Sequence, residues 1–264
     1  MHVSEDPILF EKSDGIATLT LNRPKAGNGI NMAMARAYMD LAIRCDHDDE
    51  IRCVVLTGAG KLFCGGGDIA AFAEAGEGVS AYLSELAGTL HMGVTRFMRM
   101  AKPLVTLVNG PAAGAGLGMA IGGDIVLAGR SASFLAAYGG VGLTPDGGMS
   151  WLLPRLVGMR RAQEMIIANR KVGAKEAEEI GLVSRVIDDE DLMEEGMRQA
   201  RLLASSATSA IGGARALLLA SYENSLEGQL EREVRSIAAA GGTAECREGV
   251  GAFLEKRKPD FTKV

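Results

Sequence analysis

The chain has 264 residues, of which 47% are hydrophobic and 23% are charged, and its formal net charge is −5. This length fits one large domain or a domain with an appendage, and the acidic balance argues against nucleic acid as the main partner. No run approaches 18 apolar residues and the N-terminus carries no basic and apolar leader, so we expect no membrane association and a cytoplasmic location. Four cysteines without CxxC spacing predict free thiols, and with three histidines no metal site is expected.

Apolar periodicity, turn formers and helix caps predict alternating strands and helices over the first two thirds of the chain. In chain order the expected elements are a hairpin over residues 8–21, a helix capped by Asn31 and ending near His47, a strand over 53–57, a helix opened by Asp68, a long helix over 79–100, a strand over 104–108, a helix from about Leu117, and strands over 125–128 and 133–137.

From about Asp189 onward the strand signals disappear and only helical patterns remain. Helices are expected over 189–206, 209–221, 225–240 and 243–257. Strands alternating with helices, followed by helices alone, predict an α/β core over residues 1–190 and a helical C-terminal region over residues 191–264. The C-terminal helices have more apolar surface than they can bury alone, so we expect part of it to pack on a partner subunit.

The stretch from Lys102 to Gly123 combines a buried strand, a loop of small residues and a helix start. Gly114, Gly116 and Gly118 alternate there with small residues. Such a place leaves backbone N–H groups free to bind a negatively charged or polarised oxygen, although the glycines could serve only close strand–helix packing. The chain has no dinucleotide fingerprint, no phosphate-binding loop and no G-x-S-x-G nucleophile elbow, so an oxyanion site is favoured over a phosphate site.

Several segments, in this order and spacing, together resemble the crotonase family, the enoyl-CoA hydratases and isomerases. They are RPKAGN (23–28), LTGAGKLFCGGGDI (56–69), KPLVTLVNGPAAGAG (102–116), GDIVLA (123–128), PDGG (145–148) with LLPRLVG (152–158), and REGVGAFLEKRKPDF (247–261). The resemblance implies an α/β fold made of a spiral of ββα units, with a C-terminal helical region that forms trimers, commonly paired into hexamers. It also implies an acyl-CoA thioester as ligand, with coenzyme A as part of the substrate and no permanently bound cofactor.

The resemblance assigns residues to the binding of the thioester. Position by position, the backbone N–H groups of Gly67 and Ala115 should form an oxyanion hole for the thioester carbonyl. Their neighbours in the two loops and in the helix that follows the second loop should line the acyl-CoA site: Gly65, Gly66, Asp68, Ile69, Gly114 and Gly118. Asp68 also fits a helix cap. Lys25 stands where the family contacts the nucleotide end of coenzyme A, and Phe253 and Lys256 stand where a neighbouring subunit supplies contacts, although a basic run is ordinarily a solvated surface.

The two glutamates of the family's hydratases would fall at Gly118 and Tyr138, so neither is a carboxylate here. Asp146 remains, at the position where isomerase-type members carry a single catalytic acid, and the 1,2-epoxyphenylacetyl-CoA isomerases are most similar in motif. Without the resemblance, Asp146 reads as an ordinary turn residue after Pro145. Tyr138, Leu143 and Trp151 are interpreted as pocket walls.

Two further residues attract attention because they could form a nucleophile and base. Cys64 and His91 are instead interpreted as packing residues, since nothing in the sequence pairs them.

The sequence therefore predicts an acyl-CoA isomerase in which Asp146 takes a proton from one carbon and returns it to another. Three alternatives stay open at this point. They are hydration despite the missing glutamates, attack on the substrate by Asp146 itself as in the family's aroyl-CoA dehalogenases, and a non-catalytic member that only binds acyl-CoA or RNA.

Overall fold

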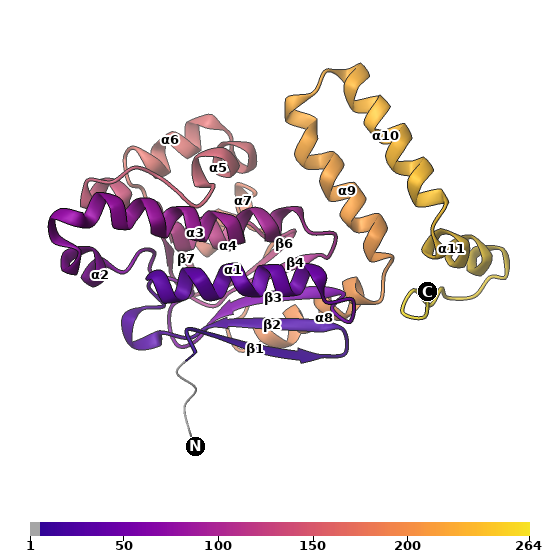
Figure 1. Ribbon diagram of the computed structural model, residues 1–264, viewed down its shortest axis with the longest axis horizontal. Helices are drawn as coiled ribbons and strands as arrows, with labels where there is room; N and C mark the ends of the chain where they lie inside the picture. The colour runs from indigo at the N-terminus through magenta and orange to yellow at the C-terminus, as the bar shows by residue number, and fades with distance from the viewer. Residues whose placement is uncertain (1–5) are drawn as a thin grey trace.

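The computed structural model describes residues 6–264 and alternates strands with helices before ending in helices alone (Figure 1). The strands are β1 (Ile8–Ser13), β2 (Ile16–Leu21), β3 (Cys53–Gly58), β4 (Leu104–Val108), β5 (Ala112–Ala113), β6 (Ile125–Gly129), β7 (Ser133–Leu135), β8 (Val172–Gly173) and β9 (Arg185–Ile187). The α-helices are α1 (Met32–His47), α2 (Ile69–Glu74), α3 (Val79–Arg99), α4 (Ala115–Ile121), α5 (Met149–Val157), α6 (Met159–Ile166), α7 (Ala174–Glu179), α8 (Leu192–Ala204), α9 (Thr208–Ala220), α10 (Leu226–Gly241) and α11 (Ala244–Leu254). Short 3₁₀ turns are η1 (Pro24–Ala26), η2 (Gly76–Gly78), η3 (Tyr138–Val141) and η4 (Ser221–Glu223).

The main sheet has the strand order β1-β2-β3-β4-β6-β9, and only the β1–β2 pair is antiparallel. The predicted hairpin is confirmed, and its turn residues Asp14 and Gly15 both have the positive φ that a two-residue hairpin turn needs. Every residue of β4 is buried, as expected for a central parallel strand covered on both faces. A second sheet has the order β5-β7-β8. The strands β5, β8 and β9 were not predicted, because two or three residues show no periodicity.

Helices cover both faces of the main sheet. On one face α1 packs against α3 (Figure 1), and residues of both helices join the larger buried core. On the other face Leu192, Ala200 and Ala204 of α8 pack on residues of β2, β3, β4 and β6. Gly196 of α8 has no room for a side chain, since a Cβ there would lie 2.4 Å from Leu107. Although α8 falls within the predicted C-terminal region, it packs on the sheet, and the helices that stand away from the sheet are α9 to α11.

The predicted helices α9, α10 and α11 are confirmed. Figure 1 shows α9 and α10 as an antiparallel pair beside the α/β part, with α11 at the end of α10. The pair is joined to the core through Arg215 of α9, which is buried and forms an ion pair with Asp124. The Arg215 guanidinium also donates to the carbonyls of Met100 (2.7 Å) and Lys102 (2.9 Å). By contrast, α10 has no buried residue.

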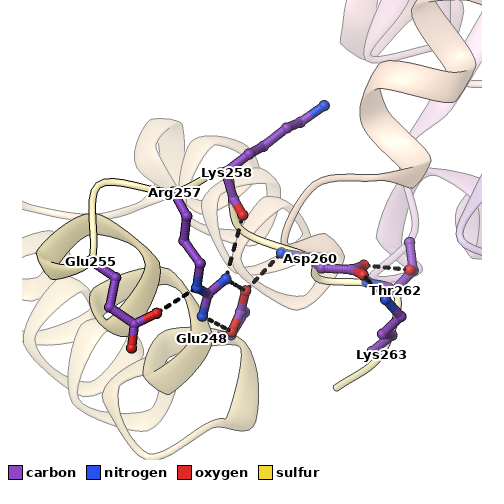
Figure 2. A network of polar contacts seen from close by, with 7 residues as sticks. All are labelled: Glu248, Glu255, Arg257, Lys258, Asp260, Thr262 and Lys263. Atoms are coloured by element: carbon purple, nitrogen blue, oxygen red, sulfur yellow. Dashed lines mark hydrogen bonds and ion pairs between the residues drawn. The ribbon is translucent and has the colours of Figure 1, made fainter.

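A network of polar contacts folds the C-terminal segment back onto α11 (Figure 2). The Arg257 guanidinium donates to Glu248 (2.6 and 2.9 Å) and to Glu255 (2.6 Å), and the Asp260 N–H donates to Glu248 (2.7 Å). Hydrogen bonds from Arg257 and then from Asp260 lower the pKa of Glu248 to about 2. Glu248 is therefore ionised at neutral pH and holds residues 255–260 against its helix.

Within residues 6–264, no single helix is both long and apolar enough to cross a membrane. Only the bent pair of α8 with α9 and η4 reaches the necessary length and hydropathy, when the two are counted together. No three His, Cys, Asp or Glu side chains of the described residues are grouped so that they could hold a metal ion. Residues 1–5, which contribute to the prediction that no leader is present, lie outside the described residues.

Candidate active site

The two glycine-rich loops predicted from the sequence meet through their backbones. A Cβ on Gly66 would lie 2.9 Å from the Ala113 carbonyl oxygen and 3.3 Å from Cα of Gly114. Gly66 and Gly114 also have positive φ values of 95° and 53°, which side chains rarely adopt. The Ala113 N–H donates to the Cys64 carbonyl (2.9 Å) and fixes the two loops together. Glycine is therefore required here both for the backbone conformation and for the close approach.

Some backbone N–H groups of these loops donate hydrogen bonds within the protein, and others do not. Those of Gly65 and Gly114 donate to backbone carbonyls at 2.8 and 3.0 Å. Among the hydrogen bonds between residues 6–264, none has the N–H of Gly67 or of Ala115 as its donor. Ala115 is the first residue of α4, where the N–H has no partner within the helix. Gly67 and Ala115, assigned to the oxyanion hole by resemblance, thus both keep a free donor.

Gly67 and Ala115 line the same cavity, which we term the first cavity and which has a volume of about 460 Å³. Asp146 lies in its wall and is the only carboxylate that lines it among the described residues. The remaining walls are largely apolar side chains from α2, α3 and the loop after β7, namely Ile69, Phe72, Leu83, Leu86, Leu90, Val141 and Leu143. The first cavity therefore combines two free N–H donors, one carboxylate and an apolar enclosure, which suits a ligand with a polarised carbonyl and an apolar group.

Tyr138 forms a hydrogen bond with Asp146. Its hydroxyl donates to Oδ1 of Asp146 at 2.5 Å. Burial raises the pKa of Tyr138, and the negative charge of Asp146 raises it further, so the phenol stays protonated and acts as a donor. Tyr138 lines the first cavity, as predicted, but the interpretation as a wall alone was incomplete because it also orients the carboxylate.

His91 is the residue that the sequence interpretation missed. Its Nε2 atom accepts a hydrogen bond from the Gly147 N–H (2.9 Å) and lies 3.7 Å from Oδ2 of Asp146. The side chain is 44% exposed, so the interpretation of His91 as a packing residue was wrong. His91 and Asp146 are 55 positions apart in the sequence, and they meet because α3 passes beside the loop that carries Asp146. No local sequence pattern predicts this contact.

Cys64, by contrast, is a packing residue as expected. It is fully buried, its thiol contacts the Asn28 carbonyl, and burial raises its pKa to about 12. All four cysteines are free thiols, as predicted.

Gly118, which the resemblance places at one of the two hydratase glutamate positions, has no room for a side chain. A Cβ on this residue would lie 2.7 Å from the carbonyl oxygen of Gly147. The loop carrying Asp146 thus occupies the volume that a glutamate side chain would need, and Gly118 lets that loop approach α4. Gly118 is buried and does not itself line the first cavity.

Asp68 caps α2, as its sequence position allows. Its carboxylate accepts hydrogen bonds from the N–H groups of Ala70 (3.2 Å) and Ala71 (3.4 Å) and pairs with Arg23 (2.8 Å). Burial alone would raise the pKa of Asp68, but Arg23 and the two N–H groups outweigh it, and the pKa is lowered. The side chain is committed to these contacts and does not line the first cavity.

The other predicted contact residues lie farther out. Trp151 lines a separate cavity next to Asp146, with the Arg155 guanidinium 4.0 Å from its ring centroid. Lys25 is exposed in η1. Phe253 is 83% exposed on α11, and Lys256 follows that helix. Neither lines the first cavity of its own chain.

Comparisons with known proteins show the family of this chain. The family model for enoyl-CoA hydratase/isomerase matches residues 11–264. The chain is 39% identical to the 1,2-epoxyphenylacetyl-CoA isomerase of Escherichia coli strain K12, covering 97% of this chain and 98% of that protein. It is 32% identical to a 4-chlorobenzoyl coenzyme A dehalogenase of Arthrobacter, covering 96% and 92%. The crystal structure of an enoyl-CoA hydratase from Polaromonas superposes with a TM-score of 0.91 at 30% identity, covering 96% and 98%. The chain therefore belongs to the enoyl-CoA hydratase/isomerase family, the crotonases, and has the crotonase fold expected from its motifs.

Proposed function

We propose that this protein is an acyl-CoA isomerase that binds the thioester oxygen between the N–H groups of Gly67 and Ala115 and moves a proton with Asp146. The observation that carries the proposal is the composition of the first cavity, where two free backbone donors stand with a single carboxylate. The similarity to a 1,2-epoxyphenylacetyl-CoA isomerase supports the same reaction class. Coenzyme A enters as part of the substrate, and no permanently bound cofactor is needed.

The chemistry follows from where charge develops. When Asp146 takes a proton from the carbon next to the thioester, the electron pair of that C–H bond moves toward the carbonyl and an enolate forms. Two fixed N–H donors stabilise the enolate oxygen, and one such donor is worth roughly 2.7–4 kcal/mol. Asp146 then returns a proton to a different carbon, so the same group acts first as base and then as acid. The Tyr138 hydroxyl holds the carboxylate in place during both steps.

Hydration is less consistent with this site. Adding water across a double bond requires that the water be held and deprotonated while a carbon is protonated, which the family's hydratases do with two glutamates. Here one of those positions is Gly118, filled by the loop of Gly147, and the other is Tyr138, whose phenol stays protonated. A single carboxylate lines the first cavity among the described residues. One carboxylate is sufficient for a proton shuttle between two carbons.

A second candidate is nucleophilic substitution by Asp146, favoured by the position of His91. In that reaction the Asp146 carboxylate would displace a leaving group from an acyl-CoA ring, and water activated by His91 would cleave the resulting ester. His91 is 3.7 Å from Asp146, and a 4-chlorobenzoyl coenzyme A dehalogenase is among the relatives. However, Nε2 of His91 accepts a hydrogen bond from the Gly147 N–H, so its lone pair must be released before it can take a proton. This requirement places the isomerase first.

We further propose a homotrimer or a dimer of trimers, assembled through the C-terminal helices. Several large apolar side chains of α9 to α11 are exposed, including Leu218, Leu230, Val234, Ile237, Val250 and Phe253. In such an assembly α11 of one copy would bring Phe253 and Lys256 to the coenzyme A of its neighbour, while Lys25 would serve its own site. Mass photometry or light scattering at micromolar concentration tests this, and a monomer would contradict it.

A panel of thioesters tests the reaction class. The purified protein is incubated with straight-chain and ring-containing 3-enoyl-CoA esters, 2-enoyl-CoA esters and a 4-halobenzoyl-CoA, and products are separated from substrates by chromatography before mass spectrometry. The proposal expects isomers of unchanged mass from the 3-enoyl esters. A mass gain of one water from the 2-enoyl esters alone would favour hydration, and a transient aryl ester on Asp146 would favour the second candidate. Tight binding without any product would indicate a non-catalytic protein.

A further inference from the structure

Asp146 lies between two cavities. Besides the first cavity, it lines a second cavity of about 440 Å³ between α3, α5 and α9. His91 and Thr95 of α3 form one wall of this second cavity, Ser150 and Trp151 of α5 form another, and Leu219 of α9 contributes a third. The glycine-rich loops with the free N–H donors line the first cavity and not the second. The carboxylate can therefore be reached from a side that a bound thioester does not occupy.

The two oxygens of the Asp146 carboxylate have different surroundings. Oδ1 accepts the hydrogen bond from Tyr138, which lines the first cavity. None of the hydrogen bonds between residues 6–264 is accepted by Oδ2, and Nε2 of His91 lies 3.7 Å from it. His91 lines the second cavity and not the first. Oδ2 is consequently the carboxylate oxygen without a hydrogen bond, and it lies beside His91, which lines the second cavity.

The second cavity is open to solvent and partly polar. The residues Thr95 and Ser150 in its walls are exposed, and the His91 side chain is 44% exposed. His91 also borders a groove of about 500 Å³ on the outer surface of α3, together with Met92 and Arg96. A cavity of this size that offers two hydroxyl groups and an imidazole meets the requirements for holding several water molecules. Water can thus stand beside Oδ2 without passing through the first cavity.

We propose that the second cavity is a separate solvent route to Asp146, through which the proton held by the aspartate exchanges with water between the two half-reactions. The inference rests on the proposed isomerase function. Asp146 first takes a proton from the substrate carbon, and the electron pair stays on the substrate as the enolate. The carboxylic acid then passes that proton to water in the second cavity and receives another from it, so charge and atoms are balanced. The exchanged proton is finally delivered to the second carbon.

The first cavity does not serve this exchange during turnover. Binding of a thioester fills the apolar space around Gly67 and Ala115 and expels water from it, as closed active sites do. Only the face of the carboxylate toward His91 then stays in contact with solvent. His91 contributes as a positioning residue, because its Nε2 holds the Gly147 N–H and so fixes the loop of Asp146 at the boundary between the cavities.

The test follows the origin of the delivered proton. A 3-enoyl-CoA ester is isomerised in D₂O, and mass spectrometry measures deuterium at the carbon that receives the proton. We expect deuterium in most product molecules of the parent protein. Thr95→Phe fills the second cavity from α3, and Ser150→Phe fills it from α5. In each variant the deuterated fraction should fall at least about twofold while the isomerisation rate stays within about threefold of the parent.

Thr89→Phe is the matched control, since it makes the same change on α3 at a residue that lines neither cavity. It should leave the deuterated fraction unchanged. If both cavity-filling variants turn over and exchange like the parent, or if the parent retains the substrate proton in every turnover, the solvent route is refuted and the isomerase function still stands. If the parent isomerises no thioester, the proposed function fails and this inference fails with it. Total product, counted irrespective of isotope, separates the two results.

Discussion

The Tyr138 hydroxyl lies 2.5 Å from Oδ1 of Asp146, so Tyr138 holds the carboxylate to which we assign the proton transfer. This contact changes the expected effect of removing the hydroxyl. A pocket wall would affect substrate affinity, whereas an orienting donor affects the chemical step.

Tyr138→Phe should therefore lower kcat more than it raises KM. A hydrogen bond to a charged group is worth about 1.5–3 kcal/mol, which corresponds to a decrease in kcat of about 10-fold to 100-fold if all of it serves the transition state. Steady-state kinetics on the best thioester of the panel measures the separate changes in kcat and KM. Leu143→Ala, which alters the wall of the same cavity without touching Asp146, should show the opposite split. An unchanged kcat for Tyr138→Phe would mean that the hydroxyl does not position the carboxylate.

Gly118→Ala should displace the loop that carries Asp146. The added Cβ would meet the Gly147 carbonyl oxygen at 2.7 Å, and an added methyl group in a packed site typically costs about 1–3 kcal/mol. We expect a lower unfolding temperature and a loss of activity larger than the loss of stability explains. Gly122→Ala is the control at the C-terminal cap of the same helix, where a Cβ would have ordinary contacts of 3.5 Å and more. Equal behaviour of the two variants in calorimetry and in turnover would contradict the steric account.

Lys256→Gly separates the backbone role of this residue from its charge. Lys256 has a φ of 55°, a left-handed conformation that glycine adopts without strain. The variant should be at least as stable as the parent. If the ammonium group contacts coenzyme A of a neighbouring copy, KM should rise by up to about fivefold, the upper end for an exposed ion pair. The same acyl group on pantetheine, which lacks the nucleotide, is the control substrate and should show no change. An equal rise for both substrates would remove Lys256 from the nucleotide site.

The cysteines should differ in reactivity. Burial raises the pKa of Cys45, Cys53 and Cys64 to about 12, so at neutral pH these thiols carry almost no thiolate. Cys246 is only partly buried. Titration with a thiol-reactive disulfide at pH 7 should show fast reaction of one thiol in the folded protein and of all four after denaturation. Cys246→Ser should abolish the fast phase. If a thiol still reacts fast in folded Cys246→Ser, one of the three buried cysteines must be accessible, and this expectation is wrong.

Sequence patterns anticipated the elements with strong local signals. The hairpin around Asp14 and Gly15, the cap at Asn31 and the C-terminal helices are set by turn chemistry, capping and periodicity within a few residues. The strand β9 is three residues long and exists because it adds to the edge of β6, so no window of sequence reveals it. Likewise, the packing of α8 on the sheet depends on which apolar face finds an uncovered surface.

For the candidate site, too, the sequence predicted the residues with local signals and not those placed by tertiary contacts. Gly67, Ala115 and Asp146 each belong to a motif of consecutive residues, so the sequence alone could point to them. All three line the first cavity. His91 was misjudged because its contact with Gly147 and Asp146 arises from the path of α3 across the fold. The reason for glycine at position 118 was also hidden, because the clash involves a carbonyl 29 residues away. Contacts of this kind need the tertiary structure.

The measurement that tests the central claim most directly is the turnover of Asp146→Asn on the thioester that the parent converts fastest. Asparagine keeps the shape and the turn propensity of aspartate and can still contact Tyr138, so the loop should fold as before. It cannot accept a proton at neutral pH, and general acid–base help is typically worth about 10²–10⁴-fold. We predict that kcat falls by at least about 10²-fold. The dissociation constant for a non-reactive acyl-CoA, measured by calorimetry, should stay within about threefold of the parent value, because Gly67 and Ala115 keep their N–H donors. Wild-type turnover by a correctly folded Asp146→Asn protein would contradict the assignment of Asp146 as the proton-transferring group.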